Sequence, residues 1–167
     1  MEKTGIFYSF RSVKTAQQIK KIVKLLDSEI ESVDIDIATG YDFMKFTNYI
    51  LAVPTWFDGE LPNYWDEFLP SIDEEDLAGK QFAIFGGGDQ KGYPENFVDG
   101  IGLMAQFIEE RGGKIVGLTS TEGYEFESSR AQRGEQFLGL ALDIENQAAL
   151  SNERIEKWVD TLKTEFK

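Results

Sequence analysis

Three segments of this chain carry side chains that could bind a ligand. The first, residues 9–15, contains hydroxyl groups and two cations, which can hold an anion. The second, residues 54–60, contains Trp56, and the third, residues 86–93, ends at Tyr93 after several glycines. Because both aromatic residues lie in polar, glycine-containing surroundings, we expect them to stack on a ligand rather than fill a core.

Each segment alone also has an ordinary structural explanation. A serine or threonine between a strand and a helix can cap the helix, and glycines can serve only as turns. The glycines do not fit the dinucleotide-binding pattern G-x-G-x-x-G, and Val13-Lys14-Thr15 lacks those of a nucleotide triphosphate loop. Tyr8-Ser9 follows the first apolar run, where a response regulator would have paired acids.

Two residue types that are central to enzyme chemistry are absent. The 167 residues include no cysteine, which excludes disulfides, thiolate zinc sites, iron–sulfur clusters and thiol nucleophiles. They include no histidine, which excludes the commonest general base, the commonest metal ligand and the Ser-His-Asp triad. We therefore expect no catalysis by thiol or imidazole and assign no metal ligands, while a divalent ion bound by surface carboxylates stays open.

The net charge of −13 is distributed unevenly along the chain. Residues 1–24 carry six basic side chains and one acidic side chain, whereas residues 58–78 carry eight acids and no base. Such an acidic run is either a solvated face or a surface that steers a basic partner. The overall charge argues against binding to nucleic acid or to an anionic membrane surface.

Apolar runs alternate with amphipathic stretches, which predicts an α/β fold with a parallel sheet covered by helices on both faces. The sequence indicates one domain over residues 1–167. We expect strands at 5–8, 33–37, 48–53, 82–85 and 114–118, and helices at 15–26, 96–111 and from Ser151 as N-cap. Residues 120–136 are polar and precede a second apolar run at 137–142. The simplest interpretation is one edge strand split by an insertion of about 20 residues, longer than a passive connection usually is.

The three candidate segments follow the carboxyl ends of strands expected near the centre of the sheet. Ligands of open parallel sheets bind outside those ends. The first segment also leads into a helix, whose N-terminal amides favour an anion. The sequence therefore predicts that the three segments meet at one edge of the sheet.

Taken in order, these segments resemble the flavodoxin family of the long-chain type, over essentially the whole chain. The resemblance rests on Pro54-Thr55-Trp56, on the glycine-rich run from Gly86 to Phe97, and on residues 120–126, 137–143 and 146–147. It implies a flavodoxin-like three-layer sandwich whose five-stranded parallel sheet has its last strand split by the insertion. It also implies a low-potential carrier of single electrons that binds FMN non-covalently and has no substrate chemistry of its own.

The resemblance places the FMN phosphate over residues 10–15 and the flavin ring between Trp56 and Tyr93. The Phe57-Asp58 peptide would face flavin N5. The cofactor-binding residues that the resemblance implies are Phe10, Arg11, Ser12, Val13, Lys14, Thr15, Pro54, Thr55, Trp56, Phe57, Asp58, Gly59, Gly87, Gly88, Asp89, Tyr93, Asn96, Phe97 and Asp99.

The first loop departs from the family pattern Thr/Ser-x-Thr-Gly-x-Thr. Phe10 replaces a hydroxyl residue, Val13 replaces the glycine, and Gly87 stands where threonine is common. If residue 13 requires a positive φ, Val13 would cost about 1–3 kcal/mol of strain. Arg11 and Lys14 could offset that loss with charge.

We therefore expect FMN to bind, more weakly than is usual for the family. The alternative is a flavodoxin-like binding or regulatory module that has lost FMN or holds another anion. For the carrier, the expected partners are basic redox proteins, such as a flavodoxin or ferredoxin reductase, and electron acceptors. The N-terminus shows no signal region, and we expect a cytoplasmic monomer.

Overall fold

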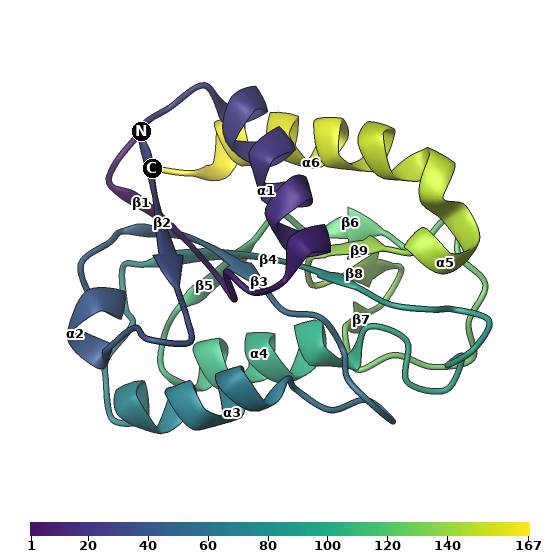
Figure 1. The fold of residues 1–167 in the computed structure, drawn as a ribbon, viewed down its shortest axis with the longest axis horizontal. Coiled ribbons are helices and arrows are strands. Elements are labelled where there is room, and N and C mark those ends of the chain that lie inside the picture. The colour runs from purple at the N-terminus through teal and green to yellow at the C-terminus, as the bar shows by residue number, and fades with distance from the viewer.

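A parallel sheet lies at the centre of the computed structural model, which describes residues 1–167 (Figure 1). Its strands follow the order β2-β1-β3-β4-β5, and β9 also pairs with β4. Their bounds are β1 Thr4–Tyr8, β2 Ile30–Asp34, β3 Asn48–Ala52, β4 Gln81–Gly87, β5 Lys114–Val116 and β9 Leu140–Leu142. The first half of β4 pairs with β5 and the second half with β9, so these two strands share one edge position. The predicted split of the last strand is confirmed.

Helices cover both faces of the sheet, which confirms the flavodoxin-like three-layer α/β class (Figure 1). Helices α1 (Val13–Leu26) and α6 (Ser151–Glu165) lie on one face, and α3 (Asn63–Phe68) and α4 (Asp99–Glu110) lie on the other. The shorter elements are α2 (Gly40–Phe43), η1 (Leu69–Ile72), α5 (Ile144–Gln147) and η2 (Ala148–Leu150). None of the helices combines the length and the apolar character that a bilayer-spanning segment needs.

The sheet has a hydrophobic core on each face, because the side chains of each strand alternate between the two faces. Successive residues of a strand point to opposite faces, so Ile6 packs in the core beneath α1 and α6 while Phe7 packs in the core above α3 and α4. Every residue of β3 is buried, as expected for a central parallel strand that is apolar on both faces. Trp158 of α6 is also buried and donates from Nε1 to the Gly117 carbonyl, 2.8 Å away.

The inserted segment builds a small sheet of its own. Strands β6 (Thr119–Ser120), β7 (Gln132–Arg133) and β8 (Gln136–Phe137) pair antiparallel in the order β6-β8-β7. Phe137, expected in the resumed edge strand, instead belongs to this small sheet, and the resumed strand begins at Leu140. The apolar run at 137–142 therefore serves two sheets.

Several boundaries differ from the prediction, including the start of α1 at Val13 and the end of β5 at Val116. Strand β2 ends at Asp34, because the Asp34 carbonyl accepts hydrogen bonds from the amides of Ile37 and Ala38. These hydrogen bonds form a turn. Helix α4 begins at Asp99, after Val98 with a φ of 48°. Ser151 is not an N-cap, because α6 continues directly from η2 with Leu150 at the cap position. Helix α3 was not predicted.

The two chain ends meet at the amino edge of the sheet (Figure 1). The Lys167 carbonyl accepts from the Glu2 amide at 2.6 Å and from Asn48 Nδ2 at 3.0 Å. The Lys167 amide donates to Gln81 Oε1 at 2.9 Å. Asn48 is fully buried, so its side chain is the polar link between β3 and the C-terminus.

We expect Asn48→Ala to lower the free energy of unfolding by about 1–3 kcal/mol, because it removes the hydrogen bonds that this buried side chain makes to Thr4 and Lys167. Urea unfolding measures this loss. Lys163→Ala, an exposed change in the last turn of α6, is the matched control and should have little effect. Equal stability of Asn48→Ala and the unmodified protein would contradict the assigned link.

Candidate functional site

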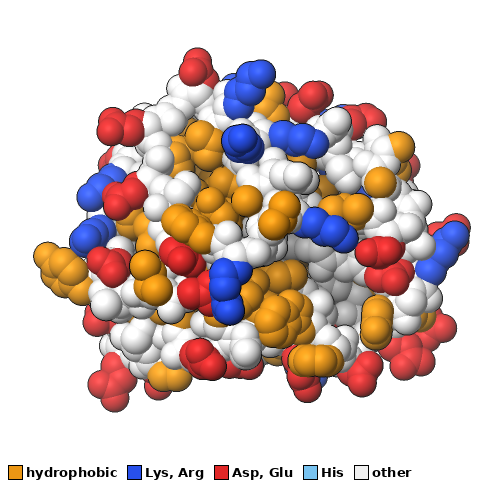
Figure 2. Space-filling view, viewed as in Figure 1, with side chains coloured by type: hydrophobic (Ala, Val, Ile, Leu, Met, Phe, Trp, Pro, Cys, Tyr) orange, Lys and Arg blue, Asp and Glu red, His pale blue; other side chains and the backbone are white.

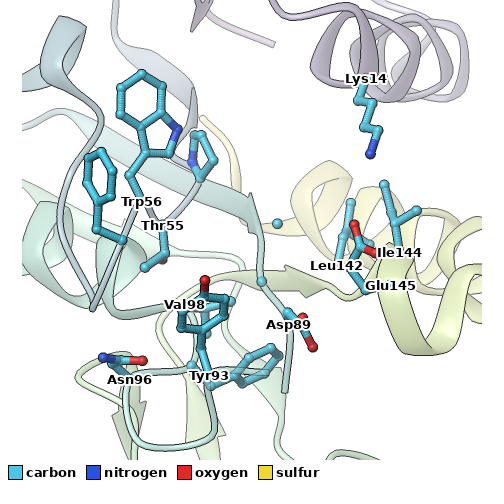
Figure 3. Close-up of a pocket in the computed structure, with 15 residues that line it drawn as sticks. Lys14, Thr55, Trp56, Asp89, Tyr93, Asn96, Val98, Leu142, Ile144 and Glu145 are labelled. Carbon is cyan, nitrogen blue, oxygen red and sulfur yellow. The ribbon is translucent and has the colours of Figure 1, made fainter. Parts of the chain in front are cut away.

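A cavity of about 550 Å³ opens at the carboxyl edge of the sheet, where the three candidate loops meet (Figure 3). Its volume is within the range of small-molecule sites. Eleven predicted residues line it, namely Lys14, Pro54, Thr55, Trp56, Phe57, Gly87, Gly88, Asp89, Tyr93, Asn96 and Phe97. The sequence prediction missed four lining residues, Val98, Leu142, Ile144 and Glu145.

The remaining predicted residues lie nearby but do not line this cavity. Phe10, Arg11, Ser12, Val13 and Thr15 surround the start of α1. Asp58, Gly59 and Asp99 line a neighbouring acidic groove, which Asn96 also borders. Burial is the main cause that raises the pKa of Asp99, whose carboxylate accepts from the Arg130 amide at 2.8 Å.

Two aromatic side chains, Trp56 and Tyr93, line the cavity. Trp56 is half-buried and packs edge-on against Tyr64, with ring centroids 5.6 Å apart. Tyr93 comes from the loop after β4 and is 48% exposed. Figure 3 shows both projecting from separate loops, with Lys14 of α1 on the far side of the cavity from Trp56.

The loop that carries Trp56 is a tight turn closed by two backbone hydrogen bonds of 2.8 Å between Trp56 and Glu60. Gly59 has a φ of 89°, and a Cβ there would lie 2.6 Å from Asp99 Oδ2, so the turn requires glycine. Phe57 has a φ of 48°, which is uncommon for a bulky residue, and is 73% exposed at the rim.

The loop that carries Tyr93 is folded around Asp89. The Asp89 carboxylate accepts from the amides of Lys91 at 3.2 Å and Gly92 at 2.8 Å, and its carbonyl accepts from the Tyr93 amide. The hydrogen bond from Gly92 is the main cause that lowers the pKa of Asp89. A Cβ on Gly88 would collide with Val98 and Phe97, whereas one on Gly87 would meet only the Leu142 carbonyl at 3.7 Å.

The first loop presents an open helix start. The Ser12 amide donates to the Ser9 carbonyl and the Ala16 amide to the Ser12 carbonyl, while the amides of residues 13–15 have no acceptor in the protein. The Ser12 hydroxyl donates to the Thr15 hydroxyl at 2.8 Å, and no side chain caps the helix. These donors are available to an anion.

The expected backbone strain at Val13 is absent. Val13 is the first residue of α1 and is not among the residues with positive φ. It is 70% exposed, so its branched side chain meets no crowding. The departure from glycine therefore carries no strain penalty, and the expectation that strain at Val13 weakens anion binding was wrong.

Arg11 is turned away from the cavity and held by Asp36. Its Nη2 and Nε lie 2.8 and 3.2 Å from the two carboxylate oxygens, and the Ser9 hydroxyl donates to the same group at 2.6 Å. The hydrogen bond from Arg11 is the main cause that lowers the pKa of Asp36. Phe10 stacks on Tyr8 instead of entering the cavity. Of the two cations, only Lys14 lines the cavity.

The surface around the cavity has a divided charge. In Figure 2 basic side chains gather above the hollow, over α1, and acidic side chains lie below and beside it. The acids between Phe57 and Gly79 are all exposed, and two of them, Asp66 and Glu67, lie on α3.

Comparison with known proteins identifies the family. Residues 11–158 match the family model described as Flavodoxin. The chain is 40% identical to the flavodoxin of Nostoc sp. over 166 residues, covering 99% of this chain and 98% of that protein. It is 40% identical to flavodoxin 1 of Escherichia coli over 168 residues, covering 99% of this chain and 96% of that protein. The Fusobacterium nucleatum flavodoxin, solved bound to flavin mononucleotide, superposes with a TM-score of 0.94 at 34% identity over the full length of both chains. This chain belongs to the flavodoxin family.

Proposed function

We propose that this chain binds FMN non-covalently in the 550 Å³ cavity and carries single electrons between redox proteins. The observation that carries the proposal is that Lys14, from the open start of α1, lines one cavity together with the aromatic side chains of Trp56 and Tyr93. FMN has the matching shape, with a phosphate at one end and a planar ring at the other. When bound, FMN supplies the one-electron chemistry, for which the chain needs neither histidine nor cysteine.

The phosphate end would be held by α1. The three free amides of residues 13–15 point out of the helix N-terminus, where the helix dipole also favours an anion. The hydroxyls of Ser12 and Thr15 lie beside them, and Lys14 adds a positive charge from the cavity wall. This donor set fits a phosphate without the glycine of the family pattern.

The ring end would be held by Trp56 and Tyr93, with the backbone of Gly87, Gly88 and Asp89 at its edge. The planar side chains can stack on a flavin. Asp58, Asp89 and Glu145 place negative charge near this end, which disfavours an added electron and lowers the reduction potential.

No observation favours the alternative of a module that has lost FMN. That alternative rested on the altered first loop, in which Phe10 and Gly87 stand where hydroxyl residues are common and Val13 replaces a glycine. The strain expected at Val13 is absent, because Val13 begins a regular helix. We propose that the chain works as one domain and turns over no substrate of its own.

The partners we propose are basic redox proteins, such as a flavodoxin or ferredoxin reductase and electron acceptors. Asp58, Glu60 and Asp66 line the groove beside the cavity, near the rim marked by Phe57, and would steer a basic partner toward the ring. The complexes would be small and transient, as electron-transfer encounters usually are. We further propose a cytoplasmic monomer with neither nucleic acid nor membrane as a partner.

The function is tested by titrating apoprotein with FMN and then measuring electron transfer. We expect saturable quenching of FMN fluorescence, because the ring stacks on Trp56 and Tyr93. The photoreduced protein should then reduce cytochrome c, a basic one-electron acceptor. That rate should fall as salt is added, because screening shortens the reach of the exposed acids to about 8 Å at physiological ionic strength.

The double variant Asp66→Asn/Glu67→Gln is the control for docking, since it changes two acids of α3 outside the FMN cavity. It should bind FMN normally and show a weaker salt dependence. If FMN fluorescence stays unchanged with apoprotein at about 100 μM, the binding free energy is less than about 5.5 kcal/mol. That result would overturn the carrier function.

The two cations of the first loop should contribute unequally to FMN affinity. We expect Lys14→Gln to weaken FMN binding about tenfold, or about 1.4 kcal/mol, because its ammonium faces the phosphate end. Arg11→Gln should weaken it less than about threefold, because Asp36 already neutralises the guanidinium.

Fluorescence titration with FMN and with riboflavin measures both effects. Riboflavin lacks the phosphate, so neither variant should change its affinity. If Arg11→Gln weakens FMN binding as much as Lys14→Gln does, Arg11 must leave Asp36 and hold the phosphate.

A further inference from the structure

Asp143 is a fully buried acid directly after β9, and it lies outside the cavity. Its Oδ2 accepts from the Gln90 amide at 3.1 Å and from Gln90 Nε2 at 2.6 Å. Its Oδ1 accepts from the Asn146 amide at 3.0 Å, and Asn146 Nδ2 lies within 3.1 Å of both oxygens. Every partner is a donor, so the site suits a carboxylate and no other side chain of that size.

Gln90 belongs to the loop that carries Tyr93, and Asn146 of α5 contacts that loop. Gln90 is itself buried, and its Oε1 accepts from the Glu125 amide of the inserted segment at 2.6 Å. Asn146 Nδ2 also donates to Asp89 Oδ1 at 2.7 Å. Asp143 therefore connects the end of the resumed strand to both residues that begin the Tyr93 turn.

Tyr93 has little else to fix it in place. Its ring is 48% exposed and makes no aromatic pair, whereas Trp56 packs against both Phe57 and Tyr64. Its amide donates only to the Asp89 carbonyl. The position of its ring thus depends on the hydrogen bonds that hold residues 89 and 90.

We infer that Asp143 is a positioning residue for the Tyr93 loop, and through it for the ring end of the ligand site. The expected effect of Asp143 on FMN binding rests on the proposed function. Its effect on the order of the loop does not. An amide at position 143 would direct N–H groups at N–H groups of Gln90 or Asn146. Without a ligand, the loop would then lose the hydrogen bonds that order it. Ligand binding would have to order the loop as well, which lowers the affinity.

The test is Asp143→Asn, examined with and without ligand. In apoprotein we expect the amides of Lys91, Gly92 and Tyr93 to exchange hydrogen at least tenfold faster than in the unmodified protein. FMN and riboflavin should both bind about tenfold more weakly and by the same factor, because the ring end and not the phosphate end is affected. The visible circular dichroism of the bound flavin should also change.

Asn146→Ala gives a second route that spares the buried carboxylate. Asn146 is exposed, so its removal should leave the protein folded while breaking the bridge between Asp89 and Asp143. It should reproduce both effects in weaker form. Glu109→Gln, which breaks an exposed ion pair between α4 and Arg133 of the inserted segment, is the matched control and should change neither.

The inference is overturned if folded Asp143→Asn and Asn146→Ala keep the exchange rates and both affinities of the unmodified protein. It is also overturned if they weaken FMN binding while riboflavin binding is unchanged, since the phosphate end would then be the part affected. A different result separates the two proposals. If the unmodified protein does not bind FMN, but Asp143→Asn still speeds hydrogen exchange of the amides in the Tyr93 loop, the proposed function is refuted and the role of Asp143 in the loop stands.

Discussion

The structure depends on one constraint, which is that parallel strands deliver all their outgoing loops to the same edge of the sheet. The backbone groups at that edge cannot all find partners within the sheet and helices. The free amides at the start of α1 are the clearest case, because neither a side chain nor another backbone group satisfies them. A cavity lined by Lys14 from the start of α1 on one side and by aromatic side chains on the other is a direct consequence of this arrangement.

Acidic residues perform two separate tasks in this chain. Asp36, Asp89 and Asp143 accept hydrogen bonds from loop residues and so hold the loops around the cavity. The exposed acids between Phe57 and Gly79 make no such bonds to the cavity loops, and three of them, Asp58, Glu60 and Asp66, line the groove beside the cavity. The basic N-terminal segment is likewise divided, since Arg11 is neutralised by Asp36 and Lys14 faces the cavity.

Much of the fold could be predicted because β3 and β4 are apolar on both faces and α1 has a regular apolar spacing. Trp56 and Tyr93 could be placed at the cavity because they follow those strands. Leu142 and Ile144 could not, because they reach the cavity only through the pairing of β9 with β4. The direction of the Arg11 side chain was also beyond prediction, since it depends on Asp36 in a turn 25 residues away. Val13 was misjudged because the family glycine implied a special φ, whereas here the helix simply begins there.

The unstrained start of α1 is tested most directly by the FMN dissociation constant of Val13→Gly. Since Val13 is helical and exposed, restoring the family glycine should leave that constant within about threefold of the value for the unmodified protein. Binding that becomes tenfold tighter or more, about 1.4 kcal/mol, would show that the valine does obstruct the phosphate site and would contradict this account.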